Sequence, residues 1–318
     1  MTGDRVGDGI LKFPVIRAFK ENNSKSKLIW ATEKNPSVFF RSLADLGSQY
    51  LDEIHESTSI GSLFKKDKFL PQTHFDTIIC TETSILKTLV LKKFKARKLI
   101  SPAAGFLFSS SRPTENYTNQ SSYERFLNLM NLASDKPLLP KFSIPIPKTY
   151  LDFAEDRLDK RLVFVGLNPG AGSEDKKWPL DLYVQVAKLL SKHNIVPTFF
   201  LGPMEKVIKT ELEKRIPESI FPENDYSRQR AASPLLTVAL AQKMAFSLVN
   251  DSGGGHLVAA GGKKTITLFN DRRGAKFRSP FCEQVSINGL DFGVRKVRDI
   301  PYEPVLLAVN REIQSLIT

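Results

Sequence analysis

Short apolar runs along the chain alternate with longer stretches whose apolar residues recur every three or four positions. The runs predict strands at 27–32, 75–80 and 97–101 in the first half, and at 161–165, 196–201, 246–250 and 265–269 in the second. The stretches between them predict helices, among them 83–95, 181–191 and an amphipathic closing helix at 302–317. Such alternation is typical of α/β domains with parallel sheets.

The chain also divides into two predicted domains. Proline disfavours helix interiors and central strands, and four prolines fall close together at Pro137, Pro140, Pro145 and Pro147. We therefore expect an interdomain linker there, ending near Arg157, with domains at 1–150 and 151–318. A length of 318 residues agrees with two domains. The segment 109–122, rich in Ser, Thr, Asn and Pro, predicts a loop.

A glycine turn stands between the predicted strand 246–250 and an alanine-rich helix. It reads Asp251-Ser252-Gly253-Gly254-Gly255-His256. Glycines let a backbone approach a ligand closely, and the first N–H groups of a helix have no partner within it, so the turn suits a phosphate or diphosphate. The alternative is that the glycines serve packing only.

Two more strand-end loops carry small or functional residues. One runs from Leu167 to Pro179 and includes Gly170, Ser173, Lys176 and Trp178. The other, Gly202-Pro203-Met204-Glu205, places a carboxylate at a helix start. Ligands in open α/β sheets bind outside the carboxyl ends of the strands. We therefore expect all three loops to share one crevice.

Taken in order, these loops resemble glycosyltransferase family 9, the lipopolysaccharide heptosyltransferases. The resemblance rests on a proline-glycine loop followed by Lys-x-Trp-Pro at 169–179 and on a turn at 202–205 that is one residue shorter than the family's Gly-x-x-x-Glu-like turn. It rests also on the family's Asp-Ser/Thr-Gly-x-x-His-Leu-x-Ala-Ala, which residues 251–260 match. Near the start, Gly7 to Lys20 is similar to the family's Gly-Asp opening and its following helix, and segments 75–79 and 123–130 match its later elements.

The resemblance implies a GT-B fold, in which two Rossmann-like, doubly wound domains face each other across a cleft. The N-terminal domain would bind the acceptor and the C-terminal domain the nucleotide sugar. It implies an inverting transfer of a heptose or related sugar from a nucleoside diphosphate sugar, with ADP-heptose as the leading donor, to an acidic lipopolysaccharide core acceptor. Ahead of Gly7 the chain has only Met1 to Val6, too short and polar for a buried parallel strand, so we expect the first strand of the N-terminal domain to be missing.

The resemblance also implies two catalytic groups. Asp8, in a glycine-flanked loop, would take the proton of the acceptor hydroxyl, with Asp4 as a substitute; the alternative is that Asp8 caps the following helix. Lys176 would hold the leaving diphosphate. Lys177 is the neighbouring candidate for the same role. The alternative for Lys177 is that of an exposed cation beside a helix start.

The resemblance implies that the three loops bind the donor. The implied residues are Gly170, Ser173, Glu205, Asp251, Ser252, Gly253, Gly254 and His256. Glu205 suits the ribose hydroxyls, or alternatively a helix start without a ligand. His256, in a first helical turn, suits a neutral hydrogen-bonding role or a structural one. We expect Trp178 to pack beneath its loop.

Several function classes lack their signatures. No Asp-x-Asp occurs in the chain, so we expect no metal cofactor or other cofactor. Cys80 and Cys282 stand alone and predict two reduced thiols. The glycine turn lacks the spacing of a nicotinamide-binding Gly-x-Gly-x-x-Gly. With no apolar run or leader pattern, we expect a cytoplasmic protein, peripheral on the inner membrane.

Charge adds one clue about partners. The net charge is +12, and residues 1–150 hold 22 basic against 14 acidic side chains, with dense runs at 65–68 and 92–98. Such runs are either solvated faces or attract an acidic glycolipid or anionic membrane surface. A nucleic-acid partner is not expected, because no recognition motif accompanies the charge. A degenerate relative that binds a sugar nucleotide without turnover remains the alternative function.

Overall fold

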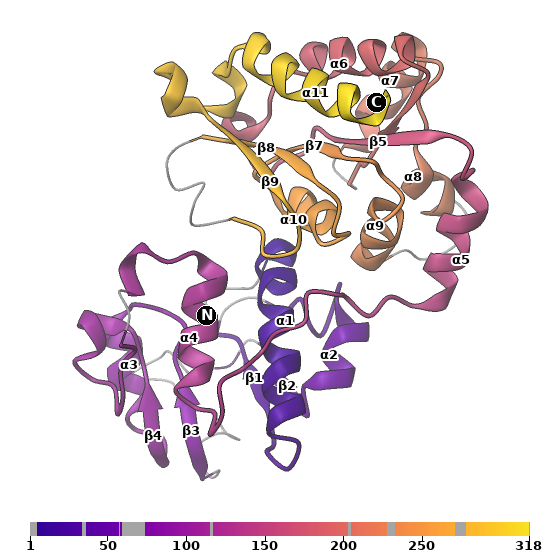
Figure 1. The fold of residues 1–318 in the computed structure, drawn as a ribbon. Coiled ribbons are helices and arrows are strands. Elements are labelled where there is room, and N and C mark those ends of the chain that lie inside the picture. Colours follow the sequence, from indigo (N-terminus) through magenta and orange to yellow (C-terminus); the bar gives the residue numbers. More distant parts are fainter. Residues whose placement is uncertain are drawn as a thin grey trace. The chain divides into compact units, whose positions relative to one another are not determined.

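The computed structural model describes residues 5–33, 36–56, 58, 74–114, 117–202, 205–227, 233–270 and 278–317. The chain forms two compact units, Met1–Lys141 and Phe142–Thr318, which we call unit 1 and unit 2 and describe separately. The predicted boundary fell after residue 150, and the structure divides the chain after Lys141. Figure 1 shows the elements of each unit.

Unit 2 contains one sheet of five parallel strands. The strands are β5 (Val163–Asn168), β6 (Ile195–Phe199), β7 (Ser247–Asn250), β8 (Thr265–Phe269) and β9 (Gln284–Asn288), in the spatial order β6-β5-β7-β8-β9. All residues of β7 and β8 are buried, as expected for parallel strands covered on both faces. The four predicted strands of this half are confirmed, and β9 was missed.

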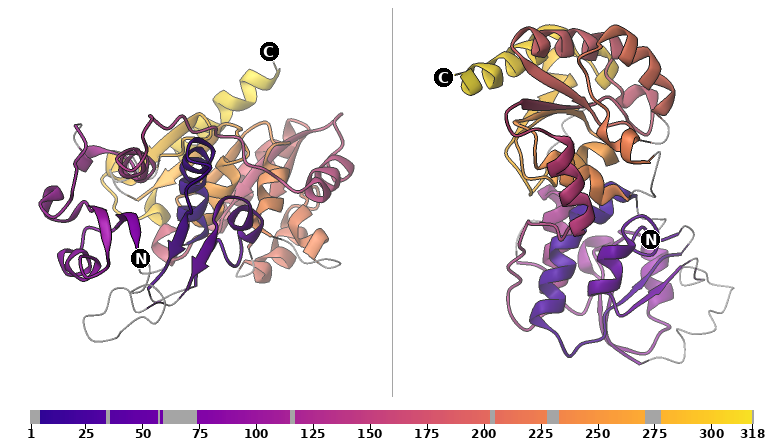
Figure 2. Two further views of the ribbon diagram at one scale, coloured as in Figure 1. Left: turned by 90° about the horizontal axis from the view of Figure 1, so that it is seen from below. Right: turned by 90° about the vertical axis from the view of Figure 1, so that its right-hand side faces the viewer.

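Helices cover both faces of that sheet. They are α5 (Lys148–Arg157), α6 (Leu180–Lys192), α7 (Lys206–Arg215), α8 (Pro222–Ser227), α9 (Pro234–Ala241), α10 (Gly253–Ala259) and α11 (Tyr302–Ile317). Figures 1 and 2 show α6 and α11 on one face and α9 and α10 on the other. Helix α9 is buried from Leu235 to Ala241, which suits a helix that is apolar all round.

The predicted linker is wrong over its second part. Residues Lys148–Arg157 form α5, which begins directly after Pro147, where a proline is compatible with a helix start. Tyr150 and Ala154 are buried, and the Tyr150 hydroxyl accepts a hydrogen bond from the Ser233 N–H at 3.2 Å. Burial of this helical face against α9 makes the segment part of unit 2.

Unit 1 has two separate parallel pairs of strands. Strand β1 (Ile29–Ala31) pairs with β2 (Glu53–His55), and β3 (Phe75–Ile79) pairs with β4 (Ala96–Ile100). Among the strands that the structure describes, the two pairs are not joined. The three predicted strands of this half are confirmed as β1, β3 and β4, whereas β2 was not predicted.

The helices of unit 1 are α1 (Val6–Asn22), α2 (Ala44–Tyr50), α3 (Ile85–Leu91) and α4 (Ser122–Asn131). Helix α1 is buried over most of its circumference, and it packs against α2 and α4. Helix α4 begins with a capping box formed by Ser121 and Glu124. The prediction of a missing first strand falls on residues up to Val6, of which the first four lie outside the described part, and α1 already begins at Val6.

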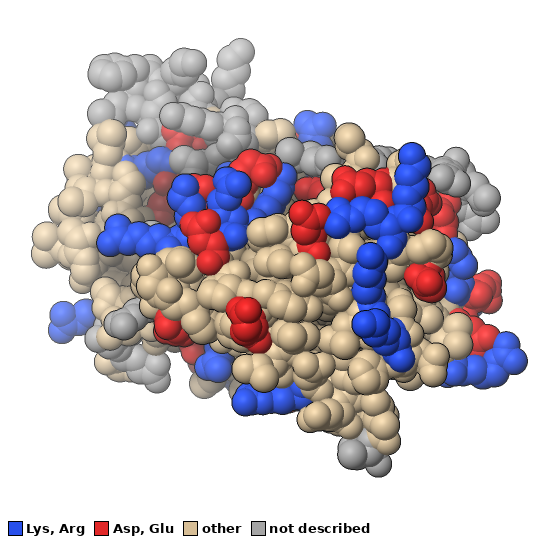
Figure 3. All heavy atoms as spheres, turned by 90° about the horizontal axis from the view of Figure 1, so that it is seen from above, with Lys and Arg blue, Asp and Glu red and all other residues tan. Residues whose placement is uncertain are grey.

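Charged side chains are distributed unevenly over what is described. The 65–68 run lies outside the described residues, while Lys92, Lys93, Lys95, Arg97 and Lys98 are exposed on and before β4. On the face of unit 2 that bears α6 and α11, Figure 3 shows acidic and basic side chains interspersed. None of the helices that the structure describes combines the length and apolar composition that a membrane crossing needs.

Candidate active site

The strand order of unit 2 reverses beside β5. Strand β6 follows β5 in the chain and lies on one side of it, while β7 and the later strands lie on the other. The loops after β5 and β7 therefore leave the sheet in different directions and open a crevice at the carboxyl ends, where α/β folds bind ligands. These are the two loops that carry Lys176 and Asp251.

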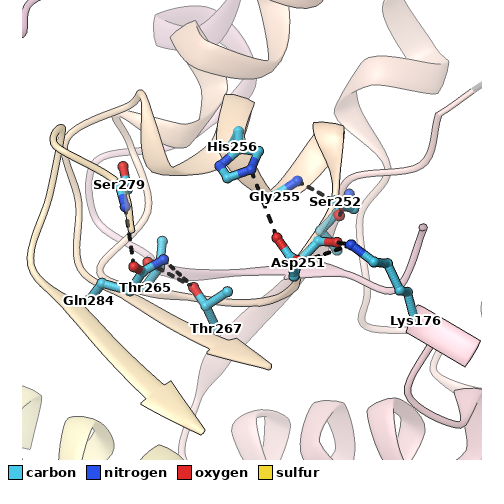
Figure 4. A network of polar contacts seen from close by, with 10 residues as sticks. Lys176, Asp251, Ser252, Gly255, His256, Thr265, Thr267, Ser279 and Gln284 are labelled. Carbon is cyan, nitrogen blue, oxygen red and sulfur yellow. Dashed lines mark hydrogen bonds and ion pairs between the residues drawn. The ribbon is translucent and has the colours of Figure 1, made fainter. Parts of the chain in front are cut away.

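Asp251 is the centre of a charged cluster in this crevice (Figure 4). Asp251 is 5% exposed, and its N–H donates to the Leu268 carbonyl at 3.0 Å. The Lys176 Nζ lies 2.7 Å from Asp251 Oδ2 and 3.5 Å from the Asp251 carbonyl oxygen. The lysine side chain is 35% exposed. The buried carboxylate thus holds an ammonium group that is still open to solvent.

His256 approaches the same carboxylate from α10. Its Nε2 lies 3.9 Å from Asp251 Oδ1, and the side chain is largely buried. This contact is an ion pair only when the imidazole is protonated. The structure therefore brings Lys176, Asp251 and His256 together, as predicted, from the loop after β5, the turn after β7 and helix α10.

Ser252 serves as the N-cap of α10. Its Oγ accepts a hydrogen bond from the Gly255 N–H at 3.1 Å and donates one to Asn168 Oδ1 at 3.3 Å. The hydroxyl is therefore committed to the helix start and to the β5 loop. The N–H groups of Gly253 and Gly254 precede the first bond within the helix, as at every helix start.

Close packing explains why two of the three positions in this turn are glycine. A Cβ on Gly254 would lie 2.9 Å from Asn168 Nδ2, and a Cβ on Gly255 would lie 2.4 Å from the Asn250 carbonyl oxygen. No side chain larger than hydrogen fits at Gly255 without moving the backbone. The packing alternative therefore accounts for Gly254 and Gly255 of this motif.

Glu205 joins the β5 and β6 loops. Its carboxylate lies within 2.9 Å of the place where a Cβ on Gly170 would stand, and its Oε2 lies 2.8 Å from the same point on Gly202. Glu205 is the residue before α7 and makes no side-chain cap to that helix. The three loops thus come together, and Pro203 and Met204 lie outside the described residues.

A buried polar scaffold supports the loops, and the sequence reasoning missed it. Asn168 Nδ2 donates to the Phe200 carbonyl at 2.9 Å, and Asn250 Nδ2 donates to the Pro169 carbonyl at 2.8 Å. The Tyr183 hydroxyl contacts the Asn168 carbonyl at 3.1 Å and Asn250 Oδ1 at 3.2 Å. Burial raises the pKa of Tyr183 well above its usual value. An asparagine that ends each of two apolar strands was the available signal.

Trp178 packs beneath its loop, as expected. It is almost fully buried, its Nε1 donates to the Ile300 carbonyl at 2.9 Å, and its ring stacks on Tyr302. The competitor Lys177 pairs with Glu174 at 2.6 Å, so Lys176 is the lysine directed at Asp251. Ser173 is exposed, and its carbonyl accepts from the Lys176 N–H at 3.1 Å.

Asp8 belongs to unit 1, and the prediction that it lies in a loop is wrong. It is in the first turn of α1, half-buried, between the buried residues Gly7 and Gly9. Arg5 is the N-cap position, so Asp8 is not the cap either. A Cβ on Gly9 would lie 2.6 Å from Val38 Cγ2, so close packing leaves no room for a side chain at this position. Asp4 lies outside the described residues.

Within the described ranges, no group of three or more His, Cys, Asp or Glu side chains is placed to hold a metal ion. Lys176 and, when protonated, His256 place positive charge beside Asp251. An ammonium beside helix N–H groups can stabilise negative charge on a phosphate, and a buried carboxylate can fix the ammonium in place.

Comparison with known proteins shows likenesses in sequence and in fold. The family described as "Glycosyltransferase family 9 (heptosyltransferase)" matches residues 63–301. The lipopolysaccharide core heptosyltransferase OpsX of Haemophilus influenzae is 21% identical over 270 residues, which cover 83% of this chain and 76% of that protein.

Two solved structures have a similar fold. The family 9 glycosyl transferase of Veillonella parvula superimposes with a TM-score of 0.67 at 14% identity, covering 98% of this chain and 95% of its own. The ADP-heptose lipopolysaccharide heptosyltransferase II of E. coli gives 0.65 at 15% identity and covers 100% of both chains. The predicted α/β fold of GT-B type, with parallel sheets, is confirmed by these likenesses.

Proposed function

Because this chain belongs to glycosyltransferase family 9, the heptosyltransferase family, it is a glycosyltransferase, and we propose that it moves a heptose from ADP-heptose to a lipopolysaccharide core acceptor. The name of the E. coli structural relative supports ADP-heptose as donor, and the description of the H. influenzae relative supports the acceptor. The observation that carries the proposal is the Lys176–Asp251 pair at the strand-order reversal of unit 2.

The leaving diphosphate is the first chemical problem of such a transfer. Negative charge grows on its oxygen as the bond to the anomeric carbon breaks, so the site needs positive groups aimed at that oxygen. In our proposal Lys176 supplies the charge, the N–H groups of Gly253 and Gly254 supply hydrogen bonds, and Asp251 keeps the lysine in place. This requires no metal ion, because the lysine and the helix start replace it.

The acceptor hydroxyl is the second problem. It must lose its proton while it attacks, and a carboxylate in hydrogen-bond reach contributes about 10²–10⁴ in rate. We assign this role to Asp8. A single displacement of this kind inverts the configuration at the anomeric carbon, and the mechanism needs no covalent intermediate.

The remaining residues define donor recognition. Glu205 would accept hydrogen bonds from ribose hydroxyls, since its carboxylate stands over Gly170 and Gly202, where no side chain covers it from the glycine side. The exposed Ser173 and the Gly170 backbone would contact the nucleotide, and His256 would donate or accept one hydrogen bond. The basic side chains about β4 would attract an acidic glycolipid at the cytoplasmic face of the inner membrane.

Substitution of the two adjacent lysines tests the donor site. Lys176→Gln is expected to lower the transfer rate from ADP-heptose by about 10²–10³, because charge stabilisation of the leaving group is lost. The matched control Lys177→Gln should keep the rate within about twofold, because that side chain pairs with Glu174. Rates would be measured without added metal, with circular dichroism as a check of folding. Equal losses in both variants would contradict the assignment.

Asp8→Asn tests the base separately. We expect calorimetric binding of ADP to be unchanged and transfer to fall by about 10²–10⁴, since the proton acceptor is lost while the donor site in unit 2 is intact. UDP and GDP titrated alongside test the choice of nucleotide. Loss of ADP binding in this variant would remove Asp8 from the role of base.

One observation favours a second function, the binding of a sugar nucleotide without turnover. The two strand pairs of unit 1 are not joined in the described part, whereas the donor residues of unit 2 rest on a complete sheet. Binding of ADP together with no transfer to any lipopolysaccharide core acceptor would support this alternative.

A further inference from the structure

Helix α3 of unit 1 presents aliphatic side chains to solvent along one side. Ile85, Leu86 and Leu89 are 48%, 53% and 42% exposed. Their spacings of one, three and four residues place them on one side of the helix, and we call them the apolar stripe. Lys92 and Lys93 are exposed directly after the helix, three and four residues beyond Leu89. The exposed side of α3 is thus apolar along its length and basic where the helix ends.

The opposite side of α3 covers polar side chains. Thr88 is fully buried, and its hydroxyl lies 2.7 Å from Ser101 Oγ. The Lys87 side chain is 19% exposed, because its ammonium pairs with Glu33 and Glu82. Helices at the surface of soluble proteins usually turn their polar side chains outward. Helix α3 covers two polar side chains and exposes three aliphatic ones, so its exposed side is suited to an apolar environment.

A turn beside α3 exposes a fourth aliphatic side chain. The short 3-10 segment Ala103–Phe106 contacts α3, and Leu107, which follows it, is 74% exposed. In this segment Ala104 and Phe106 have φ angles of 47° and 70°, a left-handed backbone that residues other than glycine rarely adopt. Strained backbone of this kind is concentrated at functional sites. Here it directs the chain so that Leu107 stands in solvent next to α3.

Positive charge accompanies these aliphatic side chains. Residues 85–98 hold six basic side chains and no acidic one. The Lys92 ammonium lies 5.2 Å from the centroid of the Phe108 ring, which connects the end of α3 to the turn that carries Leu107. Asp76 is 3.8 Å from Arg97 and offsets one of the charges. The surface formed by α3 and this turn is therefore both apolar and positively charged.

An anionic lipid surface matches both properties. Aliphatic side chains enter the boundary between headgroups and acyl chains, and basic side chains beside them attract lipid phosphates. A protein partner fits less well, because lysine is depleted at protein interfaces, whereas four of the five exposed cations of residues 85–98 are lysines. A second copy of this chain would bring the same positive charges against each other. Charge thus favours a membrane over either kind of protein partner.

We propose that the apolar stripe of α3, together with Leu107, enters the interface of an anionic membrane, where Lys92 and Lys93 contact lipid phosphates. The seven residues of α3 make a helix about 10 Å long, which can lie in the interface but is too short to cross a bilayer. The proposal deepens the inner-membrane location given under Proposed function and rests on it for the kind of membrane. Vesicle binding tests it without the transfer reaction.

Binding of the whole protein to vesicles tests the apolar stripe. The vesicles consist of phosphatidylethanolamine with about one third phosphatidylglycerol, and sedimentation measures the bound fraction. Replacing Ile85, Leu86 and Leu89 together by serine should weaken binding by about tenfold or more, because three aliphatic groups no longer leave water. The matched control makes the same changes at one isoleucine and two leucines exposed on α11 of unit 2: Leu307→Ser, Leu316→Ser and Ile317→Ser.

The control should bind vesicles as the unsubstituted protein does, and circular dichroism establishes that both variants are folded. Equal binding by the two variants would overturn the proposal. Transfer to an acceptor dispersed in detergent should be the same in both variants, because no membrane is present. Failure of the proposed reaction would therefore appear as absence of transfer in every variant, and failure of the docking surface as equal vesicle binding.

A tryptophan reporter separates insertion from attraction by charge alone. Trp30 and Trp178 are buried, so an indole added at Leu86 is the one that lipid can reach. On vesicles, the emission of Leu86→Trp should shift to shorter wavelength and be quenched by brominated acyl chains. Leu307→Trp on α11 should show neither change. Bound Leu86→Trp protein with unchanged, unquenched emission would contradict insertion.

A second pair of variants tests the lysines. Lys92→Gln with Lys93→Gln should weaken binding to the anionic vesicles by about tenfold, because each basic group near such a surface adds attraction. The control is Lys188→Gln with Lys192→Gln, two exposed lysines of α6, and it should change binding by less than about twofold. Equal losses in both pairs, or equal binding of the unsubstituted protein to vesicles of phosphatidylcholine alone, would contradict the assigned contacts.

Sedimentation velocity without vesicles tests a second copy of the chain as the alternative occupant. The unsubstituted protein and the variant with serine at Ile85, Leu86 and Leu89 should have the same molecular mass. Self-association that is lost in this variant would assign the apolar stripe to an interface between two copies and would overturn the membrane proposal.

Discussion

The sheets of the two units differ in how completely their strands are covered. In unit 2 the five strands form one parallel sheet, and β7 and β8 are buried along their whole length. In unit 1 the strands form two pairs, and every residue of β2 and most of β3 is only half-buried. Parallel strands are stable when both edges are paired and both faces are covered. Unit 2 meets both conditions, and the described part of unit 1 meets neither fully.

This difference predicts that unit 1 is less stable than unit 2. Each unit contains one tryptophan, Trp30 in unit 1 and Trp178 in unit 2, so the fluorescence of each residue reports one unit. Variants Trp178→Phe and Trp30→Phe leave a single reporter, and the Trp30 signal is expected to change at the lower urea concentration. Coincident transitions would show that the two units unfold together.

The largest expected effect comes from truncating the core of each sheet. Leu248→Ala in β7 removes a side chain that is fully buried and should lower the free energy of unfolding by about 2–5 kcal/mol. Ile78→Ala in β3, where the side chain is half-buried, should cost about 1 kcal/mol because less apolar area is lost. Urea titrations measure both, and a larger loss for Ile78→Ala would reverse the comparison.

The next effect is a pH dependence of the free energy of unfolding, which we expect in unit 2. Burial raises the pKa of Glu223 from about 4.5 to about 7, although hydrogen bonds from Thr237 and the Leu201 N–H oppose the rise. The folded state therefore holds this proton more tightly than the unfolded chain, so its contribution to stability is full below pH 4.5 and is lost as the pH rises to about 7. Over that window the loss is at most about 3 kcal/mol.

Substitution removes that dependence. Glu223→Gln cannot ionise, and its amide oxygen can still accept from Thr237, so the slope of unfolding free energy against pH should flatten over that range. The Trp178 signal should show the change and the Trp30 signal should not. An unchanged slope in the variant would assign the pH dependence to other groups.

The smallest effect concerns surface charge in unit 1. The Arg97–Asp76 pair is 3.8 Å apart, with side chains 74% and 90% exposed. Arg97→Ala should therefore change the unfolding free energy by less than about 0.5 kcal/mol. If the basic side chains about β4 attract an acidic acceptor, the same variant should weaken binding to anionic vesicles, and sedimentation with vesicles measures this.

Sequence patterns predicted the strands that contain an apolar run, and they missed the two strands that do not, β2 and β9. Strand β9 reads Gln-Val-Ser-Ile-Asn and lies at a sheet edge, where Gln284 donates to Thr267 at 2.8 Å and accepts from the Ser279 N–H at 3.2 Å (Figure 4). Strand β2 has a single apolar residue, Ile54. Polar side chains stabilise such edges through long-range bonds that a local pattern does not contain.

The sequence predicted the charged residues of the candidate site but not the buried polar residues that support its loops. Lys176 and Asp251 were expected in one crevice, and the structure brings them to 2.7 Å. The asparagines at the ends of β5 and β7 were a local signal, but the partners of Asn168 and Asn250 lie far along the chain, so no local pattern indicates which bonds they make. Asp8 was expected in a loop because glycines flank it, but it lies in the first turn of α1 and both flanking glycines are buried.

The stacking of Trp178 on Tyr302 links the lysine loop to the last helix of the chain. Tyr302 begins α11, and the Trp178 indole also donates to Ile300 just before it. The stretch that carries Lys176 is therefore built partly on the C-terminal segment, more than a hundred residues away in sequence. A truncation or a fusion that disturbs α11 would therefore reach the Lys176–Asp251 pair without altering either residue.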